Sequence, residues 1–262
     1  MLMRWHLLSL DAPTVALLWC ALFVRAARAP VPVPAMELLA AGTWCLYVLD
    51  RLLDARGRRE RLRPRHLFHA RHAERFAAGV ALAVLALAAR VVPRMSAVIL
   101  RDDAVMAALV AAYFLFVHLS ERPPFPKELC VGLVFAAAAA EPAYARAGRP
   151  SALIPAALLL GLLCWWNCAA IQLWEDSAGA PAPEREDVGR RLRQGAAGLA
   201  LLSAAGLIVA GSTRTLFAAA LISAAGCWLL AWRAPRMNAL RLRVAADLVL
   251  CSPLILLAFG AA

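Results

Sequence analysis

The stretch Trp44-Cys45-Leu46-Tyr47-Val48-Leu49-Asp50-Arg51-Leu52-Leu53-Asp54 decides how this chain is read, because an apolar run ends there in two carboxylates. Asp50 and Asp54 are four residues apart, so on a helix their side chains point the same way, one turn apart. Carboxylates this close to hydrocarbon are costly and are usually paired, metal-bound or functional. The stretch therefore predicts a membrane helix with an acidic site at one end.

The composition extends this prediction to the whole chain. Of 262 residues, 63% are hydrophobic and 17% charged, and the mean hydropathy is +0.69. These values are too apolar for a soluble domain and are typical of a polytopic membrane protein. Ala and Leu dominate and strand alternation is absent, so the spans are expected to be helices. We predict an all-α single domain, residues 1–262, with nine transmembrane helices at about 12–30, 33–53, 73–93, 102–120, 128–146, 151–173, 194–212, 214–232 and 241–260.

The distribution of basic residues predicts the orientation. With a cytoplasmic N-terminus, 20 of the 28 Lys and Arg residues lie on the cytoplasmic side and eight on the other. We therefore expect an integral protein of a bacterial-type inner (plasma) membrane, with its C-terminus outside. Attraction to anionic membrane lipids accounts for the net charge of +11, and there is no motif that predicts a nucleic-acid partner. The first segment has an alternative interpretation as a signal peptide cleaved near Ala27-Arg28-Ala29.

A second polar group closes the segment that begins near Ala152. It contains Asn167, Glu175 and Asp176, and the first two are eight residues apart, about two turns along one helix face. If the second and sixth segments are neighbours, both groups face one central cavity on the cytoplasmic side. Magnesium takes one or two carboxylates and completes its octahedron with water and phosphate oxygens. The predicted metal ligands are Asp50, Asp54, Asn167, Glu175 and Asp176.

Nine helices, an inside N-terminus and acidic motifs closing the second and sixth helices resemble the UbiA-type intramembrane prenyltransferases. The first family motif, Asn-Asp-x-x-Asp-x-x-x-Asp, falls on 46–54, where Asp50 and Asp54 match its last two acids. The second, Asn-x-x-x-Asp-x-x-x-Asp, places Asn167 first and Glu175 last, with Ile171 where an acid is usual. The stretch 126–136 is similar to the start of the family's fifth helix. Tyr113 lies where the Tyr-x-x-x-Lys motif would fall, with valine at position 117.

This resemblance implies a magnesium-dependent enzyme that transfers an isoprenoid group from a prenyl diphosphate to an aromatic or other lipid-soluble acceptor. Metal ions would neutralise the diphosphate, and aromatic faces would stabilise the allylic cation. The implied catalytic residues are Asp50, Asp54, Glu175 and Asp176, and the implied substrate-binding residues are Tyr47, Arg51, Tyr113, Lys127 and Asn167. The alternative function is that of a non-catalytic relative or a small-molecule transporter, which should show broken helices and inverted repeats.

Three further expectations concern charged residues. Lys127, the one lysine of the chain, either binds diphosphate as a point charge or pairs with Glu128 as a snorkelling interfacial residue. Asp247, four residues after Arg243, is expected to form an i,i+4 ion pair with it. The stretch 175–193 contains two prolines and mixed charges, which predict a mobile loop or cap over the site.

Overall fold

The computed structural model of the chain describes residues 2–57, 64–119, 126–148 and 150–259, and over these residues it contains helices and no strand. The helices are α1 (Leu2–Leu7), α2 (Asp11–Ala26), α3 (Val33–Gly57), α4 (Pro64–Arg71), α5 (Ala73–Ala86), α6 (Ala97–Leu119), α7 (Lys127–Arg146), α8 (Ile154–Asp176), α9 (Ala182–Val209), α10 (Arg214–Arg233), α11 (Ala239–Val249) and α12 (Pro253–Phe259). A π-helical turn, Leu87–Val91, and a 3-10 turn, Val92–Arg94, continue α5. The all-α prediction is confirmed for the described residues.

Five helices are long and apolar enough to cross a membrane, and a sixth is obtained if the bent pair α11 and α12 counts as one span. The five are Ala73–Arg94, Lys127–Arg146, Ser151–Asp176, Ala182–Val209 and Arg214–Arg236. The chain is therefore consistent with a membrane protein. The prediction of nine spans is not confirmed, because α2, α3 and α6 do not meet the same condition over the described residues.

The three remaining helices fall short for identifiable reasons. Helix α2 has 16 residues, or about 24 Å of helix, against a hydrocarbon thickness of about 30 Å. In α3 the apolar run lies between Glu37 and Asp50, which leaves 12 residues. Charged residues at 101–103 shorten the apolar part of α6 in the same way.

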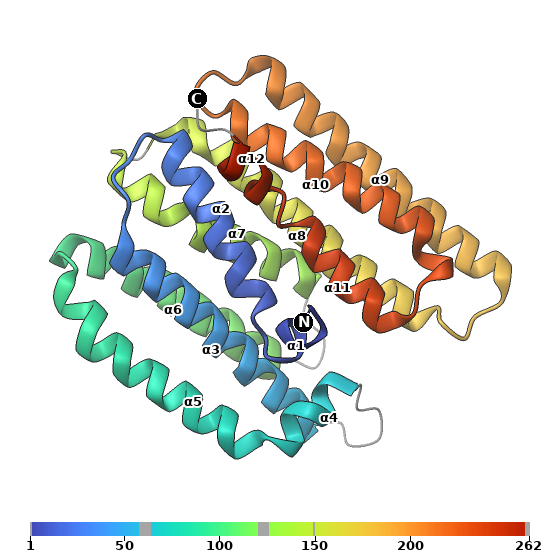
Figure 1. Cartoon of the computed structure of the whole chain (residues 1–262), viewed down its shortest axis with the longest axis horizontal. Coiled ribbons are helices and arrows are strands. Elements are labelled where there is room, and N and C mark those ends of the chain that lie inside the picture. Colours follow the sequence, from blue (N-terminus) through green and yellow to red (C-terminus); the bar gives the residue numbers. More distant parts are fainter. Residues whose placement is uncertain (1, 58–63, 120–125, 149, 260–262) are drawn as a thin grey trace.

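Helix α2 packs at the centre of the bundle, against α3, α7, α10 and α12 (Figure 1). Trp19 and Phe23 are fully buried, and the Trp19 indole donates a 2.9 Å hydrogen bond to the carbonyl oxygen of Leu250 between α11 and α12. This bond satisfies a carbonyl at the break between the two C-terminal helices. Helix α2 therefore forms part of the core of the bundle.

Helices α7 and α8 approach closely because small residues line their contact. A Cβ atom added to Gly132 would lie 2.4 Å from the carbonyl oxygen of Gly161 and 2.8 Å from the backbone nitrogen of Trp165. On α7, Ala136 and Ala139 continue the same buried stripe. Small residues that let helix backbones approach are the usual packing device inside membranes.

Helix α5 forms one edge of the bundle and contacts α3 (Figure 1). Its outer side exposes Leu82 and Leu85, at 69% and 66% of their surface. Its inner side supplies Phe76 and Val80 to a small second core with Cys45 and Val48 of α3. An apolar outer side of this kind is expected of a helix that faces lipid.

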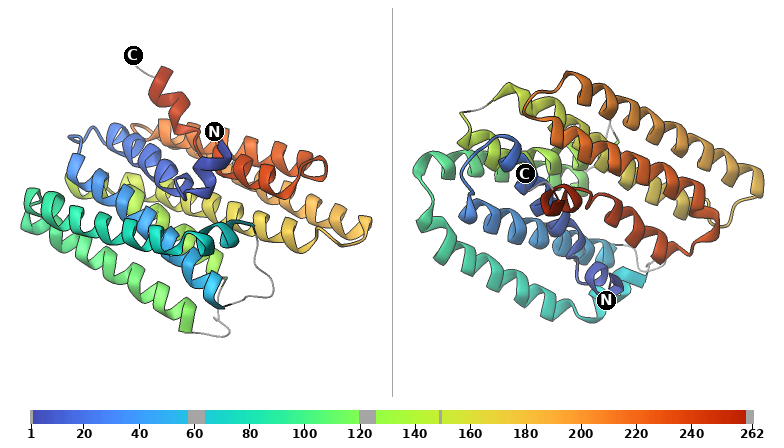
Figure 2. Two further views of the ribbon diagram at one scale, coloured as in Figure 1. Left: turned by 60° about the horizontal axis from the view of Figure 1, so that its bottom comes forward. Right: turned by 45° about the horizontal axis from the view of Figure 1, so that its top comes forward.

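The last helix leaves the direction of the bundle. Helices α11 and α12 are bent by 46° relative to each other, and α12 projects from the body of the protein (Figure 2). Pro253, the first residue of α12, lacks the amide hydrogen that a continuous helix would use there.

The region 175–193 differs from the predicted loop. Helix α9 begins at Ala182, directly after Pro181, and contains Glu184, Glu186 and Asp187 in its first turns. Pro183 is tolerated because the first helical amides have no intrahelical partner. The prediction of a loop over 182–193 is therefore wrong, and the connection that remains after α8 covers 177–181.

Candidate functional site

A buried polar cluster joins five helices, α1, α2, α3, α8 and α11, at the end of the bundle where α3 finishes (Figure 1). His6 of α1 lies with its Nδ1 atom 2.8 Å from Oδ2 of Asp11, the first residue of α2. The same Nδ1 atom is 3.1 Å from Oδ2 of Asp247 on α11. His6 and Asp11 are 2% and 3% exposed. A single imidazole thus bridges two carboxylates that are 236 positions apart in the chain.

Two predicted site residues belong to this cluster. Arg51 donates from Nη1 to the carbonyl oxygen of His6 over 2.9 Å, and its Nη2 is 3.4 Å from Oδ2 of Asp11. Asn167 donates from Nδ2 to Oδ1 of Asp247 over 3.3 Å. The side chains of Arg51 and Asn167 therefore hold other protein groups instead of lining an open binding site.

The environment of His6 favours its charged form. Burial by itself opposes the imidazolium, but the hydrogen bonds to Asp11 and Asp247, and the negative charges of both carboxylates, outweigh it. The pKa of His6 is therefore raised above its ordinary value.

A second group of predicted residues lies between α3, α6, α7 and α8. The half-buried Tyr113 donates its hydroxyl to the carbonyl oxygen of Lys127 over 3.1 Å, which ties α6 to the start of α7. Tyr113 also interacts electrostatically with Asp50, Glu128 and Cys168. Four helices thus contribute polar groups to one neighbourhood.

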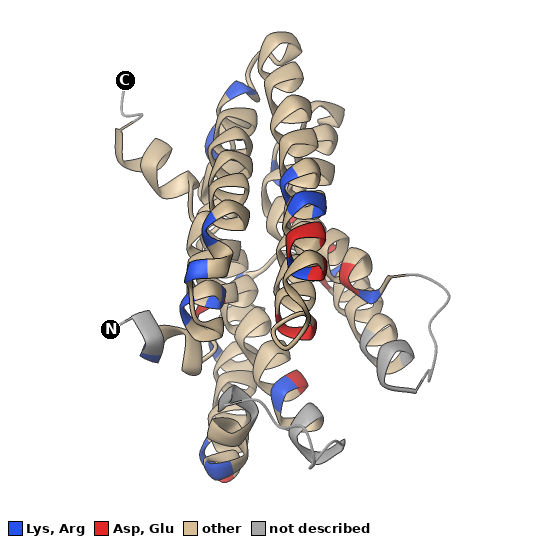
Figure 3. Cartoon of the chain, turned by 90° about the vertical axis from the view of Figure 1, so that its right-hand side faces the viewer, with Lys and Arg blue, Asp and Glu red and all other residues tan. Residues whose placement is uncertain are grey.

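Tyr47 connects this group to the buried cluster. It lies within electrostatic range of Cys168 on α8 and also of Asp11 and Asp247. Asp50 and Lys127 are both exposed, so the neighbourhood of Tyr113 reaches the surface at this end of the bundle. Charged residues of both signs gather at this end (Figure 3).

The other predicted metal ligands are placed differently. Glu175 forms an ion pair with Arg243 of α11, in which the two side chains are 13% and 8% exposed. Asp176 is exposed at the end of α8. Asp54 lies in α3, but its side chain is outside the described residues. Among the described side chains, the predicted carboxylate ligands Asp50, Glu175 and Asp176 do not form a group of three within metal-binding distance of one another.

The expected ion pair between Arg243 and Asp247 is wrong. Helix α11 turns Arg243 toward Glu175 of α8, while Asp247 accepts hydrogen bonds from the side chains of His6 and Asn167. The i,i+4 spacing was compatible with a pair within one helix, but packing against α1 and α8 offered each side chain a buried partner.

Three functional candidates were missed from the sequence, namely His6, Asp11 and Asp247. No motif joins them, and they become neighbours because α1 and α2 pack against α11. The available signal was general: an ionisable residue within or beside an apolar segment is usually functional or paired. Asp11 and Asp247 both satisfy that description.

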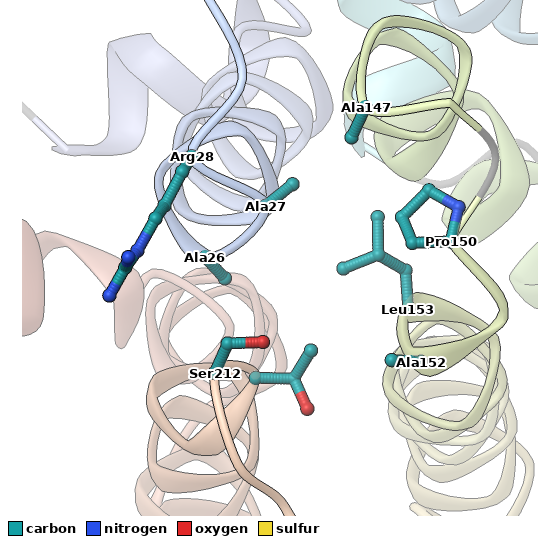
Figure 4. Close-up of a pocket in the computed structure, with 9 residues that line it drawn as sticks. Ala26, Ala27, Arg28, Ala147, Pro150, Ala152, Leu153 and Ser212 are labelled. Carbon is teal, nitrogen blue, oxygen red and sulfur yellow. The ribbon is translucent and has the colours of Figure 1, made fainter.

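A separate hollow of about 330 Å³ lies at the opposite end of α2 (Figure 4). It is lined by Arg28 after α2, by Pro150 and Leu153 before α8, and by Ser212 and Thr213 before α10. Arg28 is an exposed side chain in a left-handed backbone conformation, with φ of 51°. This hollow is remote from the predicted acidic residues, so it is not the central cavity expected from the sequence.

No known family model, curated protein or solved structure matches this chain.

Proposed function

We propose that this protein is an intramembrane prenyltransferase that takes a prenyl diphosphate and a lipid-soluble aromatic or other acceptor. The observation that supports the proposal is that the Tyr113 hydroxyl donates to the backbone carbonyl of Lys127 and lies within electrostatic range of Asp50 and Cys168, at one end of an apolar helix bundle. Asp50, Tyr113 and Lys127 come from α3, α6 and α7, and each is a site residue predicted from the sequence. An apolar bundle suits the isoprenoid tail, and the charged end suits the diphosphate.

The described residues assign roles as follows. Lys127 is exposed and offers a point charge to the diphosphate. Tyr47 and Tyr113, both within electrostatic range of Cys168, supply aromatic faces that stabilise an allylic cation. Arg51 and Asn167, by contrast, position the start of α2 and the last turn of α11 through the buried cluster. The proposal therefore gives them a positioning role and no direct contact with substrate.

Magnesium fits only a part of the predicted ligand set. Asn167 and Glu175 face Asp247 and Arg243, which leaves Asp50 and Asp176 as the exposed acidic candidates among the described side chains. One or two carboxylates are enough for a magnesium ion that takes its other ligands from water and substrate phosphate. Magnesium bound in this way would supply charge neutralisation of the leaving diphosphate.

Asp50→Asn tests this proposal, with Asp187→Asn as its control. Asp187 pairs with Arg190 and Arg191 near the start of α9, so its loss should not affect the Tyr113 neighbourhood. Binding of farnesyl diphosphate to purified protein with magnesium should weaken at least roughly tenfold in Asp50→Asn and remain unchanged in Asp187→Asn. Equal affinities in both variants, or the same affinity with and without magnesium, would contradict the proposal.

The break between α11 and α12 supports a second candidate function, a small-molecule transporter. Transporters place discontinuous helices at their binding sites, and Asp247 lies shortly before this break. Protein reconstituted in sealed vesicles distinguishes the two functions: an enzyme converts the prenyl diphosphate to product, whereas a transporter accumulates an unchanged solute.

A further inference from the structure

The cluster around His6 brings three metal-binding donor atoms to one point. His6, Asp11 and Asp247 each offer one ligand atom, and these atoms lie within 4.8 Å of one another. Among the described residues, one group of three or more His, Cys, Asp or Glu side chains has its ligand atoms this close together, and it is this one. The donors come from α1, α2 and α11, so the group depends on tertiary packing.

Unsatisfied polar atoms provide a second, independent observation. Oδ1 of Asp11 and Oδ1 of Asn167 are buried and have no hydrogen-bond partner among the described residues. Asn167 is 5% exposed, and its amide already faces Asp247. A buried acceptor without a donor is costly, and a bound cation satisfies such atoms.

The charged groups of the cluster also suit a bound cation. Asp11 and Asp247 contribute two carboxylates and Arg51 one guanidinium. His6 and Asp11 are buried, and the side chain of Asp247 is 16% exposed. A cation bound at the His6 Nδ1 atom would displace the imidazole proton that otherwise lies between the two carboxylates and would take over its role.

The donor set selects the class of cation. Zinc and related transition metals bind imidazole nitrogen at about 2.0–2.1 Å and carboxylate oxygen at about 2.0–2.2 Å, with ligands roughly 3.4 Å apart in a tetrahedron. The His6 Nδ1 atom is 2.8 and 3.1 Å from the two carboxylate oxygens, so these two separations need to increase by about 0.3–0.6 Å to reach that spacing. Magnesium and calcium prefer oxygen ligands throughout.

We propose that His6, Asp11 and Asp247 bind one divalent transition-metal cation of the zinc class. Asn167 supplies the fourth ligand after rotation of its terminal amide, which exchanges the positions of Oδ1 and Nδ2. Arg51 orients Asp11 and the backbone of His6 from outside the coordination sphere. The site has a structural role, since it fixes the N-terminal helix α1 to α2 and α11.

Cobalt(II) is the probe, because it replaces zinc and absorbs visible light when its coordination is four-fold. The full chain, without a histidine tag, is purified in detergent, stripped with a chelator and titrated with cobalt(II) and then with zinc. We expect one tightly bound ion per chain, an intense visible absorption with cobalt(II) and its loss when zinc is added. Thermal unfolding should occur at a higher temperature with zinc than with magnesium at the same concentration.

Variants locate the site. Asp247→Asn and His6→Gln should each weaken cobalt(II) binding at least roughly 100-fold, since loss of even an outer-shell partner costs about 10–100-fold. His72→Gln and Asp187→Asn remove a histidine and an aspartate elsewhere and should leave the affinity unchanged. Two ligand variants on different helices keep the test valid if one of them fails to fold.

Several results would overturn the inference. Absence of the cobalt(II) absorption in folded wild-type protein would mean that the cluster is an ion-pair network held by a proton. The same conclusion would follow if His6→Gln bound cobalt(II) as tightly as wild type. Weakening in the His72→Gln control equal to that in His6→Gln would place the metal elsewhere.

Discussion

Removal of either member of the Glu175–Arg243 ion pair should destabilise the protein strongly, whereas removal of both should not. The pair joins α8 to α11, and its side chains are 13% and 8% exposed. Glu175→Gln leaves a buried guanidinium without its carboxylate, and Arg243→Met leaves a buried carboxylate without its guanidinium. Loss of one partner from a buried pair costs about 3–5 kcal/mol. The partial exposure of Glu175 favours the lower limit, about 3 kcal/mol.

The double variant Glu175→Gln/Arg243→Met removes both charges together. Replacement of a buried pair by uncharged side chains is often close to neutral, so we expect a cost within about 1 kcal/mol of wild type. Thermal unfolding in detergent measures these differences. At roughly 2–4 °C per kcal/mol, each single variant should lose about 6–12 °C and the double variant only a few degrees.

This experiment also separates a structural role of Glu175 from its predicted catalytic role. A structural residue gives a large favourable coupling between the two substitutions in a double-mutant cycle. A magnesium ligand would instead give a Glu175→Gln protein of normal stability with weakened diphosphate binding, and an Arg243→Met protein with normal binding. That second pattern would refute the structural assignment. Additive effects of the two substitutions on stability would refute it as well.

The remaining predictions concern packing and protonation. Gly132→Ala should destabilise the protein by about 1–3 kcal/mol, because the added Cβ would clash with the Gly161 carbonyl oxygen. Gly198→Ala is the control, since nothing lies within 4 Å of its added Cβ, and it should be neutral or slightly stabilising. Thermal unfolding of both variants measures the difference. In metal-free protein the pKa of His6 is raised, so its charged form should stabilise the fold fully below about pH 6.5 and lose this contribution as the pH rises through the folded-state pKa. The difference in unfolding free energy between wild type and His6→Gln should therefore shrink from acidic to alkaline pH, and a difference that grows would contradict the assignment.

The length and hydrophobicity of apolar runs predicted several of the long helices, but not the start of α9 or the break between α11 and α12. The run predicted at 128–146 corresponds to α7, Lys127–Arg146, and the run at 214–232 to α10, Arg214–Arg233. Each of these segments is bounded by charged residues or prolines, which end apolar runs at defined positions. The number of membrane spans was not predicted correctly from the same runs. Helices α2 and α3 are apolar because they pack against other helices, but α2 is too short and α3 too interrupted by charged residues to qualify as a span.

The site was only partly predictable. Asp50 and Tyr113 were identified from their places in the motifs and Lys127 as the one lysine of the chain, and the structure places Tyr113 within range of the other two. The partners of Arg51 and Asn167 could not be identified, since they are His6 and Asp247, 45 and 80 positions away in the chain. Pairing across that separation depends on how helices pack, which periodicity along one segment does not encode.

The cluster around His6 and the neighbourhood of Tyr113 lie on different sides of helix α3. Asp50 and Arg51 are consecutive, so their side chains leave the helix about 100° apart. Arg51 is 5% exposed and faces α1 and α2, while Asp50 is exposed and within electrostatic range of Tyr113 on α6. The cluster around His6 therefore fixes the rotation of α3 about its axis, and that rotation sets the direction in which Asp50 points. A change to the cluster should therefore reach the Tyr113 neighbourhood through α3.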